Sequence, residues 1–445
     1  MKRTLASKIG KGRVDNLTDD AIQYRKFHVI AAATWISLVF GAWIYVPNMS
    51  WTIEIAIASS VVIFISAIGR TSRSRLNGFE LFILSAASIM PIWSAAASFL
   101  SFGQPLEFGL LSMRSYVVCL SGIAVYRAIL SSSSMFDIIK NAFVALAWIN
   151  LALCLLIVMA VDPNQASHWG ALVIQGGGVT NKFNLFYLFI VFGAVYYFVS
   201  VLNTFTARHA IYAIMFTCYL IIIQAGRISS LALLLSFAYA AWITRWRFAP
   251  LLLWSIGLGA LSLAAAVTFF NMALPFEISE RYADAFEALG GAYSVGDVSS
   301  QMRILQAETA IKAIQEQPLV GSGVLSARWN FGYASQFGYF HPSDLGLLGY
   351  VYTFGILGLW FPLVIYTLWI KNSFITRADF RIKQTSSTFL ISLNVFMAYF
   401  MFGGPFTGLF LLRPESILFL LSIISALNHH FILRIRPARI AGVLN

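Results

Sequence analysis

Residues 185–204 read LFYLFIVFGAVYYFVSVLNT, a run of 20 residues without a charge. A helix of this length is about 30 Å long, which is the thickness of the hydrocarbon core of a bilayer. Only helices and closed barrels satisfy every backbone polar group in lipid, and a run this long and continuous indicates a helix rather than an alternating strand. The segment therefore predicts a membrane-spanning helix.

Eleven further apolar runs of similar length occur along the chain. They lie near residues 27–46, 51–69, 79–100, 107–129, 138–160, 210–225, 229–244, 249–272, 346–370, 384–402 and 410–428. Charged residues make up 11% of the 445 residues and hydrophobic residues 59%, whereas soluble domains carry about 25% charge. This composition excludes a soluble globular protein and a protein with a single membrane anchor. We predict an all-α polytopic membrane protein with about twelve transmembrane helices.

The basic residues predict how these helices are oriented. Twelve crossings place both termini on one side, and the seven Lys and Arg residues before residue 27 mark that side as cytoplasmic. On this topology 22 of the 30 basic residues are cytoplasmic. The eight on the outer face are Arg114, Lys182, Arg227, Arg281, Arg303, Lys312, Arg328 and Arg413. The net charge of +12 is thus explained by membrane orientation, and no nucleic-acid partner is expected.

The predicted organisation has five parts. They are a cytoplasmic tail (1–26), nine spanning helices (27–272), an outer loop (273–345), three further spanning helices (346–428) and a cytoplasmic tail (429–445). The first tail lacks the short apolar run and small-residue cleavage site of a secretory signal. The three cysteines, Cys119, Cys154 and Cys218, fall inside apolar spans without CxxC spacing, so neither disulfides nor a zinc site are expected.

The outer loop is long enough to have structure and function of its own. Two helices are predicted within it, over Ile278–Leu289 and Gln301–Gln317, the second ending before Pro318. The second has an apolar stripe formed by Ile304, Ala307, Ile311 and Ile314. Such a stripe is expected to lie on the membrane domain or on the bilayer surface. Arg303, in the first turn, would then lie near the membrane boundary.

Glycines and aromatic residues follow this helix. The stretch Gly321-Ser322-Gly323 precedes the aromatic-rich segments 329–333 and 337–340, which end at His341-Pro342-Ser343-Asp344. Glycines between aromatic residues allow tight turns that present rings, as many sugar-binding surfaces do. The same rings could instead form a lid at the lipid headgroups, where Trp and Tyr concentrate. Both interpretations stay open.

Several catalytic signatures are absent from the full sequence, which has no GxxxxGK(S/T) phosphate loop, no HExxH, no GxSxG and no Asp-x-Asp pair. Nucleotide hydrolysis, zinc proteolysis and metal-dependent nucleotide-sugar transfer therefore lack their usual residues. What remains on the outer face is a small set of arginines and His341.

Arg227 lies in the turn 224–230 between two apolar spans. A charge near the membrane plane is costly and tends to mark a functional site. A guanidinium donates two parallel hydrogen bonds and stays charged, which suits a phosphate or pyrophosphate. The alternative is an interfacial arginine that extends to lipid headgroups. His341 is similarly ambiguous, because a neutral imidazole can take a proton from a sugar hydroxyl, whereas a buried one can simply satisfy a backbone carbonyl.

The order of these motifs resembles a known family. The chain has Gly226-Arg227-Ile228-Ser229-Ser230, Arg303, Pro318-Leu319-Val320-Gly321-Ser322-Gly323, and His341 followed by Phe354-Gly355-Ile356-Leu357-Gly358-Leu359. Over residues 210 to 360 it resembles the bacterial O-antigen ligase and O-antigen or exopolysaccharide polymerase family. Gly226 and Ile228 stand where Ser and Gly are common. Pro342 follows the histidine where many ligases carry Asn, which favours a polymerase.

The resemblance implies a glycosyltransferase in the bacterial inner membrane. Its donor would be an undecaprenyl-pyrophosphate-linked oligosaccharide and its acceptor a lipid-linked glycan, joined at the periplasmic face with inversion. Arg227 and Arg303 would stabilise the departing pyrophosphate, and His341 would be the general base, with no metal or other cofactor. Candidate substrate-binding residues are Arg281, Arg328, Asp344 and Arg114. Membrane lipids and a chain-length regulator are the expected partners.

Two alternatives remain. An O-antigen ligase would use the same donor but transfer the glycan to lipid A-core. A lipid-linked sugar transporter or flippase would share the layout of twelve spans with both termini inside. Transporters usually show two related halves, whereas this sequence shows no similarity between its halves and has a large outer loop only in the second.

Overall fold

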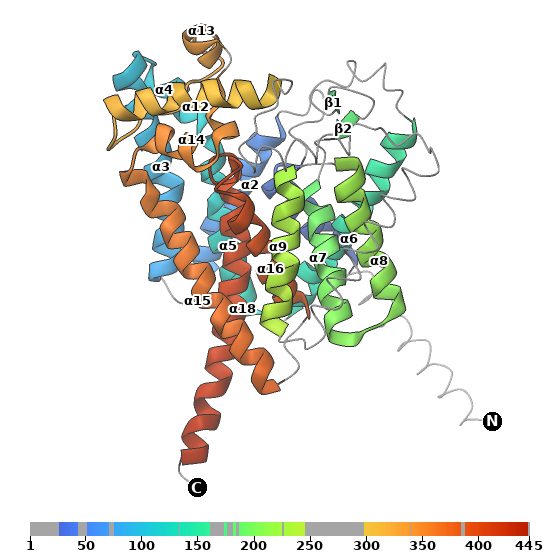
Figure 1. Ribbon diagram of the computed structural model, residues 1–445. Helices are drawn as coiled ribbons and strands as arrows, with labels where there is room; N and C mark the ends of the chain where they lie inside the picture. Colours follow the sequence, from blue (N-terminus) through green and yellow to red (C-terminus); the bar gives the residue numbers. More distant parts are fainter. Residues whose placement is uncertain are drawn as a thin grey trace, which may run out of the picture.

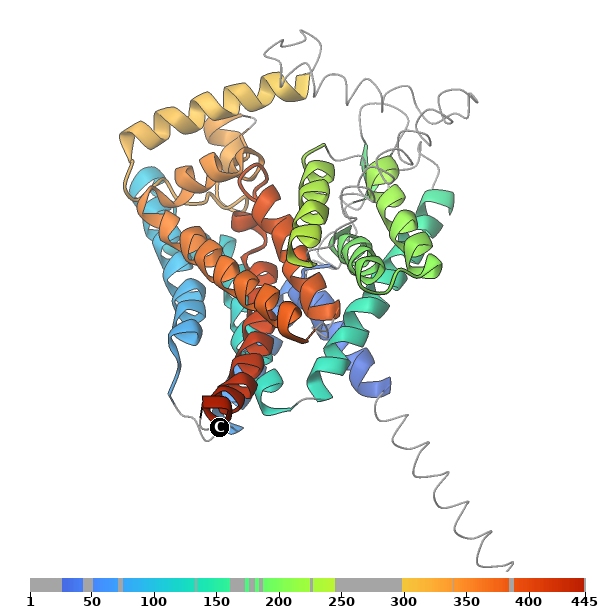
Figure 2. The same ribbon diagram turned by 60° about the horizontal axis from the view of Figure 1, so that its bottom comes forward.

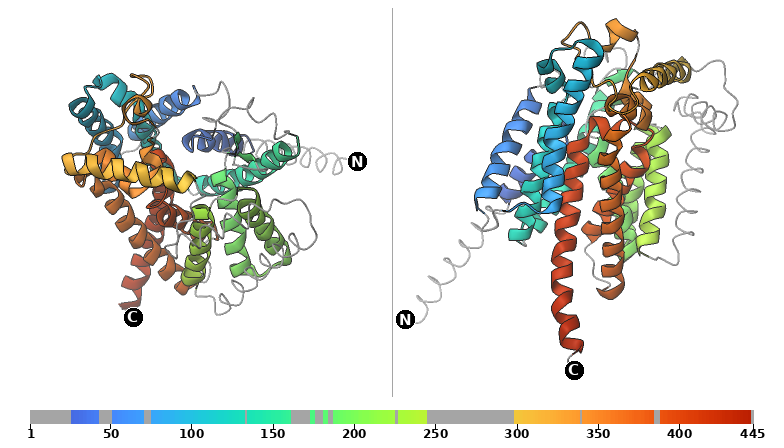
Figure 3. Two further views of the ribbon diagram at one scale, coloured as in Figure 1. Left: turned by 45° about the horizontal axis from the view of Figure 1, so that its top comes forward. Right: turned by 90° about the vertical axis from the view of Figure 1, so that its left-hand side faces the viewer.

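The computed structural model describes residues 26–42, 51–70, 75–132, 134–160, 173–175, 181–183, 187–224, 227–244, 298–338, 340–383 and 388–443. In this part of the chain long helices stand side by side as a bundle, and α12 (Val298–Glu316) lies across one end of it (Figures 1 and 2). We call this end the α12 end. The C-terminal part of α18 (Pro414–Val443) extends from the opposite end (Figure 3).

The first half of the chain contributes most of the spanning helices. After a helix over Lys26–Val39 come α2 (Thr52–Arg70), α3 (Gly78–Phe102), α4 (Leu106–Ser112), the 3-10 helix η1 (Arg114–Cys119), α5 (Leu120–Ser131), α6 (Ser134–Ala160), the strands β1 (Val173–Gln175) and β2 (Asn181–Phe183), α7 (Tyr187–Thr204), α8 (Ala207–Cys218), the π-helical turn η3 (Tyr219–Gln224) and α9 (Arg227–Thr244). The two strands pair antiparallel, with Val173 opposite Phe183. This short hairpin is the departure from the predicted all-α class.

The second half is interrupted more often. It contains α12, α13 (Tyr333–Phe337), the 3-10 helix η4 (Pro342–Leu345), α14 (Leu347–Phe354), the 3-10 helix η5 (Leu357–Leu359), α15 (Trp360–Lys383), α16 (Thr388–Gly403), α17 (Leu409–Leu412) and α18. The centre of the bundle is α16, in which every residue from Phe389 to Met401 is buried. Around it, α16 packs against α7, α9 and α18.

Four helices in the described part are long and apolar enough to cross a membrane: Thr52–Gly69, Gly78–Phe102, Ser134–Leu156 and Tyr187–Thr204. A fifth span is possible if the pair Leu106–Ser112 and Arg114–Ser131, bent by 51°, counts as one. The prediction of a helical membrane protein is therefore confirmed. The number of twelve spans and their orientation stay predictions, and residues 249–272 and 278–289 lie outside the described part of the chain.

The predicted continuous span over residues 346–370 is wrong, because the chain breaks between α14 and α15. Gly355 ends α14 with φ +69°, a left-handed conformation that side chains other than glycine rarely adopt. Beyond it, the backbone N–H of Ile356 donates to Pro318 O at 2.9 Å, and that of Leu357 to Leu319 O at 3.2 Å. A distant segment thus takes the hydrogen bonds that would have continued the helix. The span predicted near 107–129 is likewise bent rather than continuous.

A buried ion pair joins α3 to α5. Arg127 Nε donates to Glu80 Oε1 at 2.5 Å, and the two residues are 6% and 2% exposed. Glu80 also completes a capping box at the start of α3, where its backbone N–H donates to Asn77 Oδ1 and its carboxylate accepts from the Asn77 N–H, both at 2.9 Å. The other end of α3 contacts α12, since Ser101 Oγ donates to Gln317 Oε1 at 2.8 Å. The ion pair therefore lies far from the α12 end.

Candidate functional site

The helix predicted over Gln301–Gln317 forms within a few residues of its expected bounds, but a different face of it is buried. Gln306 and Ala310 are 2% and 0% exposed, whereas Ile304 and Ile311 are 43% and 45% exposed. These two isoleucines of the predicted stripe therefore do not pack on the rest of the protein, and their contact with the bilayer surface stays a prediction. Polar partners hold the buried face of the helix. Gln306 Oε1 accepts a hydrogen bond from the His341 backbone N–H at 3.1 Å, and Gln317 is held by Ser101.

The hydrogen bond of Gln306 ties the segment of His341 to the helix of Arg303. Arg303 is exposed on α12, one turn before Gln306. His341 has extended backbone angles directly before η4, and its side chain is exposed. A single buried glutamine thus connects the elements that carry two of the predicted catalytic residues.

The loop 404–408 contacts η4 and the start of α14. The Leu347 backbone N–H donates to Pro405 O at 2.9 Å, and the backbone of Gly408 lies against that of Ser343. The loop follows α16, whose last residue, Gly403, faces Ala232 near the start of α9. Arg227 is the first residue of α9, so the first turns of this helix lie beside the end of α16, which leads into the loop 404–408.

The structure therefore gathers the elements that carry Arg227, Arg303 and His341 at the α12 end of the bundle (Figure 1). Arg227 and His341 lie more than 100 positions apart in the sequence. Contacts of Gln306, of residues 404–408 and of Gly403 connect the elements that carry the three residues. Their catalytic roles stay predictions.

The structure places three of the four predicted substrate-binding residues. Arg281 lies outside the described residues. Asp344 is exposed in η4, and its backbone N–H donates to His341 O at 2.9 Å. Arg114 and Arg328 line one cavity of about 260 Å³ together with Ile53, Leu111, Ser112, Ser115, Ser326 and Ala327. The structure thus brings together two arginines whose proximity the sequence did not predict.

The aromatic-rich segment forms a small core of its own. Phe340 packs its ring centroid 5.0 Å from that of Tyr352, 5.4 Å from Tyr333 and 5.3 Å from Phe337. These rings pack with Ala310 of α12 in one hydrophobic cluster. Burial raises the pKa of Tyr333, so its phenol stays protonated and donates to Gly323 O at 3.2 Å. Phe340 and Tyr352 are therefore core residues, whereas Tyr333 and Phe337 are half-buried, and both interpretations stay open for these two rings.

Phe331 is different, because it is 83% exposed. It follows Asn330 in a tight turn in which the Gly332 backbone N–H donates to Trp329 O at 2.8 Å. Asn330 and Phe331 both have positive φ, +43° and +59°, the signature of a type I′ turn, in which Asn and Gly are the favoured central residues. A phenylalanine held there presents its ring to solvent at the cost of backbone strain.

The segment 318–326, which we call the glycine clamp, is the part of the site that sequence reasoning described least well. Its Ser322 and Gly323 backbone N–H groups donate to Tyr352 O and Thr353 O at 2.8 and 2.9 Å. On the other side, Trp93 Nε1 of α3 donates to Val320 O at 2.9 Å. The clamp therefore fastens α3 to the break between α14 and α15.

Gln104 completes the clamp and was not predicted as a site residue. It is fully buried; its Oε1 accepts from the Ser326 N–H at 2.7 Å, and its Nε2 donates to Val324 O at 3.0 Å. A buried glutamine requires such partners. The sequence signal was present, since Gln104 is a polar residue between a predicted spanning helix and the next apolar run, but nothing local indicated residues 324–326 as its partners.

Replacing Gly323 with alanine should lower the free energy of unfolding by about 3 kcal/mol, because overpacking and a left-handed backbone add their costs. A Cβ at this position would lie 2.5 Å from the Ser98 backbone nitrogen and would overlap the Ser94 carbonyl oxygen. The matched control is Gly338→Ala, at φ +70° with no atom within 4 Å, which carries only the backbone cost. Equal unfolding temperatures for the two variants would contradict the clamp.

Part of the chain is similar to a known protein family. Residues 210–363 match the family model described as O-antigen ligase. No curated protein sequence matches the chain. The matched segment includes α9, α12, the glycine clamp, η4 and α14, so it carries Arg227, Arg303 and His341, and the family indicates a membrane protein that transfers glycans. The resemblance seen in the motifs is thus confirmed over residues 210–363, which are similar to the O-antigen ligase family.

Proposed function

We propose that the protein is a polysaccharide polymerase of the O-antigen or exopolysaccharide type. It transfers a glycan from an undecaprenyl-pyrophosphate-linked donor to a sugar hydroxyl of a lipid-linked acceptor, at the periplasmic face of the bacterial inner membrane. The observation that supports this proposal is the gathering of the elements that carry Arg227, Arg303 and His341 at the α12 end, within the segment that matches the family.

The reaction is a direct displacement at the anomeric carbon. The acceptor oxygen forms a bond to this carbon while the bond to the pyrophosphate oxygen breaks, and the pyrophosphate leaves with the electron pair. His341 takes the proton of the acceptor hydroxyl as general base. Arg227 and Arg303 stabilise the negative charge that develops on the departing oxygen. The configuration is inverted, and the step as written balances without a metal ion.

Polymerase is favoured over ligase by Pro342, which follows the proposed base. Pro342 is buried and its backbone lies directly against Gly349 of α14. This position therefore has no amide side chain to hold an acceptor group, in contrast to the Asn of many ligases. Transfer to lipid A-core remains the alternative within the family.

A reconstitution experiment tests the function against transport. The purified protein in liposomes is given a lipid-linked oligosaccharide with no ion gradient, and products are separated by length. We expect multimers of the repeat unit that remain lipid-linked, because the pyrophosphate bond supplies the driving force. Movement of the lipid across the bilayer without new glycosidic bonds would contradict the proposal. Transfer only to added lipid A-core would replace polymerase by ligase.

A further inference from the structure

A second region of positive charge lies at the α12 end, away from α9. Arg114 begins η1 and Arg328 follows the glycine clamp, and both line the 260 Å³ cavity described above. Gln104 positions this part of the chain through Ser326, whose hydroxyl in turn accepts from the Arg328 backbone N–H at 3.3 Å. The two arginines are therefore brought together by the same clamp that fastens the loop to α3.

One of the hydrogen-bond donors of Arg114 has no acceptor among the described residues. Its Nη2 lies 3.4 Å from Glu54 Oε1, and its Nη1 donates to Leu111 O at 3.3 Å. Its Nε is buried and has no hydrogen-bond partner among the described residues. A buried N–H without an acceptor is costly. An oxygen of a ligand in the cavity would satisfy it. Arg328 is exposed and makes no ion pair within the described part of the chain.

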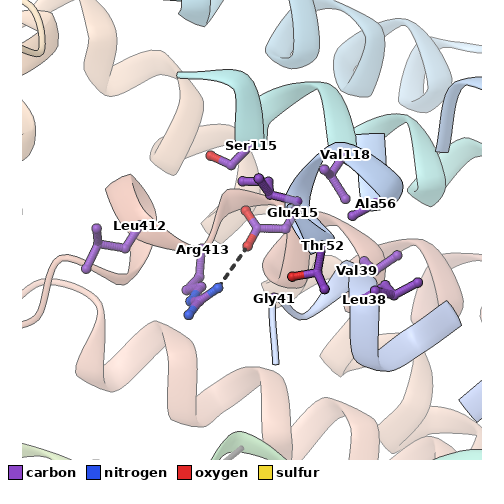
Figure 4. Close-up of a pocket in the computed structure, with 11 residues that line it drawn as sticks. Leu38, Val39, Gly41, Thr52, Ala56, Ser115, Val118, Leu412, Arg413 and Glu415 are labelled. Atoms are coloured by element: carbon purple, nitrogen blue, oxygen red, sulfur yellow. Dashed lines mark ion pairs between the residues drawn. The ribbon is translucent and has the colours of Figure 1, made fainter. Parts of the chain in front are cut away.

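An apolar groove continues from this cavity. Figure 4 shows the side chains that line this groove. Its volume is about 190 Å³, and Ile53 and Ser115 line both the groove and the cavity. Its apolar walls come from the helix over Lys26–Val39 and the turn after it, from α2, from η1 and from Leu412. The ion pair Arg413–Glu415 also lines it. Most of these walls are buried, with Ala56 and Val118 each 2% exposed, but Leu412 at the edge of the groove is 51% exposed, so the groove opens to the surface there. A basic cavity beside an apolar groove that opens to the surface fits a phosphorylated lipid with its head at the arginines.

This region and the proposed donor site lie on different sides of the molecule. α9, which begins at Arg227, packs against α7, α15 and α16, whereas α2 packs against η1 and α5. Seen from the side, α2 and α9 lie at opposite edges of the bundle (Figure 3, right). The segment of His341 lies beneath α12, held by Gln306. Two lipid-linked substrates could thus approach the same base from opposite sides.

We propose that the cavity lined by Arg114 and Arg328 binds the diphosphate of the lipid-linked acceptor, and that the adjoining groove takes the first part of its polyprenyl chain. The inference rests on the proposed function, because it assigns the second substrate of that reaction. The arginines bind the acceptor head by charge-assisted hydrogen bonds. The glycan then extends from the cavity toward His341, so the diphosphate of the acceptor is not cleaved.

The test uses the full chain in detergent, titrated with geranylgeranyl diphosphate in a calorimeter. The wild-type protein should bind two equivalents. Arg114→Gln with Arg328→Gln should bind one, and Arg227→Gln with Arg303→Gln should retain the other. Lys312→Gln removes an exposed charge of α12 that lines neither cavity, so it should bind two equivalents as the matched control. Two equivalents in the Arg114/Arg328 double variant would overturn the inference.

Two further measurements separate other outcomes. Phosphatidylglycerol that displaced the probe from the Arg227/Arg303 variant as effectively as the diphosphate lipid would show an ordinary headgroup site and overturn the inference. Two equivalents in the Arg227/Arg303 variant would contradict the proposed donor site while leaving the acceptor result intact. Arg328→Gln alone disturbs no ion pair among the described residues, so the protein should fold normally. It should raise the KM for the acceptor about tenfold, as expected when one charge-assisted contact is lost, without changing the KM for the donor.

Discussion

Replacing His341 with alanine should slow glycan transfer by between about a hundredfold and about ten-thousandfold, the range that a positioned general base contributes. The substitution removes the imidazole but keeps the backbone N–H that Gln306 accepts. The exposed side chain is not part of the hydrophobic core. The protein should therefore still fold, bind donor and acceptor, and fail at the transfer step. The measurement is the single-turnover rate of polymer elongation with saturating substrates.

His209→Ala is the matched control for this variant. His209 lies near the start of α8, where its ring is near Tyr197 and Thr204, and it belongs to none of the elements around His341. Its loss should leave the transfer rate unchanged within about twofold, since it removes no group from the reaction. If His341→Ala, present in the membrane at wild-type level, made polymer of normal length and amount, His341 would not be the base.

Replacing Arg127 with leucine should lower the free energy of unfolding by about 4 kcal/mol, because removal of one partner leaves a buried charge uncompensated. Glu80 is 2% exposed and would keep its capping bonds but lose both contacts to the guanidinium, at 2.5 and 3.3 Å. Desolvation of an unpaired carboxylate is the dominant cost. The measurement is reversible unfolding in mixed micelles, followed by circular dichroism.

A double variant isolates this cause. Glu80→Gln with Arg127→Leu removes both charges, and glutamine can serve at the same position of a capping box. It should recover most of the lost stability, since an apolar or neutral replacement of a buried ion pair is often nearly neutral. Equal stabilities for the single and the double variant would show that packing of the Arg127 side chain, rather than the charge of Glu80, explains the loss.

The helices of the bundle could be predicted from sequence where they depend on local composition alone. The long apolar runs in α2, α3, α6 and α7 form spanning-length helices at nearly the predicted residues. The break at Gly355 could not be predicted in this way, because it depends on hydrogen bonds from residues 356 and 357 to residues 318 and 319. A helix can therefore end inside a continuous apolar run when a distant segment accepts the backbone hydrogen bonds, and the run itself gives no sign of that end.

The candidate site shows the same division. The bounds of α12 follow from local signals, including Pro318 after its last turn. Its buried face does not, because Gln306 and Gln317 are held by His341 and Ser101 from elsewhere in the chain. Hydrophobic periodicity indicated the face with Ile304 and Ile311, whereas the face buried against the protein is the one that carries Gln306. The position of Arg114 and Arg328 beside one cavity could not be predicted from sequence for the same reason, since it depends on the hydrogen bonds of Gln104 to a distant segment.

The glycine clamp limits how sequences of this kind can recombine. An outer loop is often regarded as an exchangeable insert, and chimeric enzymes that swap it would seem a simple way to alter acceptor choice. Here the loop is fastened through Val320, Val324 and Ser326 to Trp93, Ser94 and Gln104. A chimera that exchanges residues 298–345 alone would separate these partners. The loop should instead be exchanged together with residues 93–104, and residues in these two segments are expected to change together during evolution.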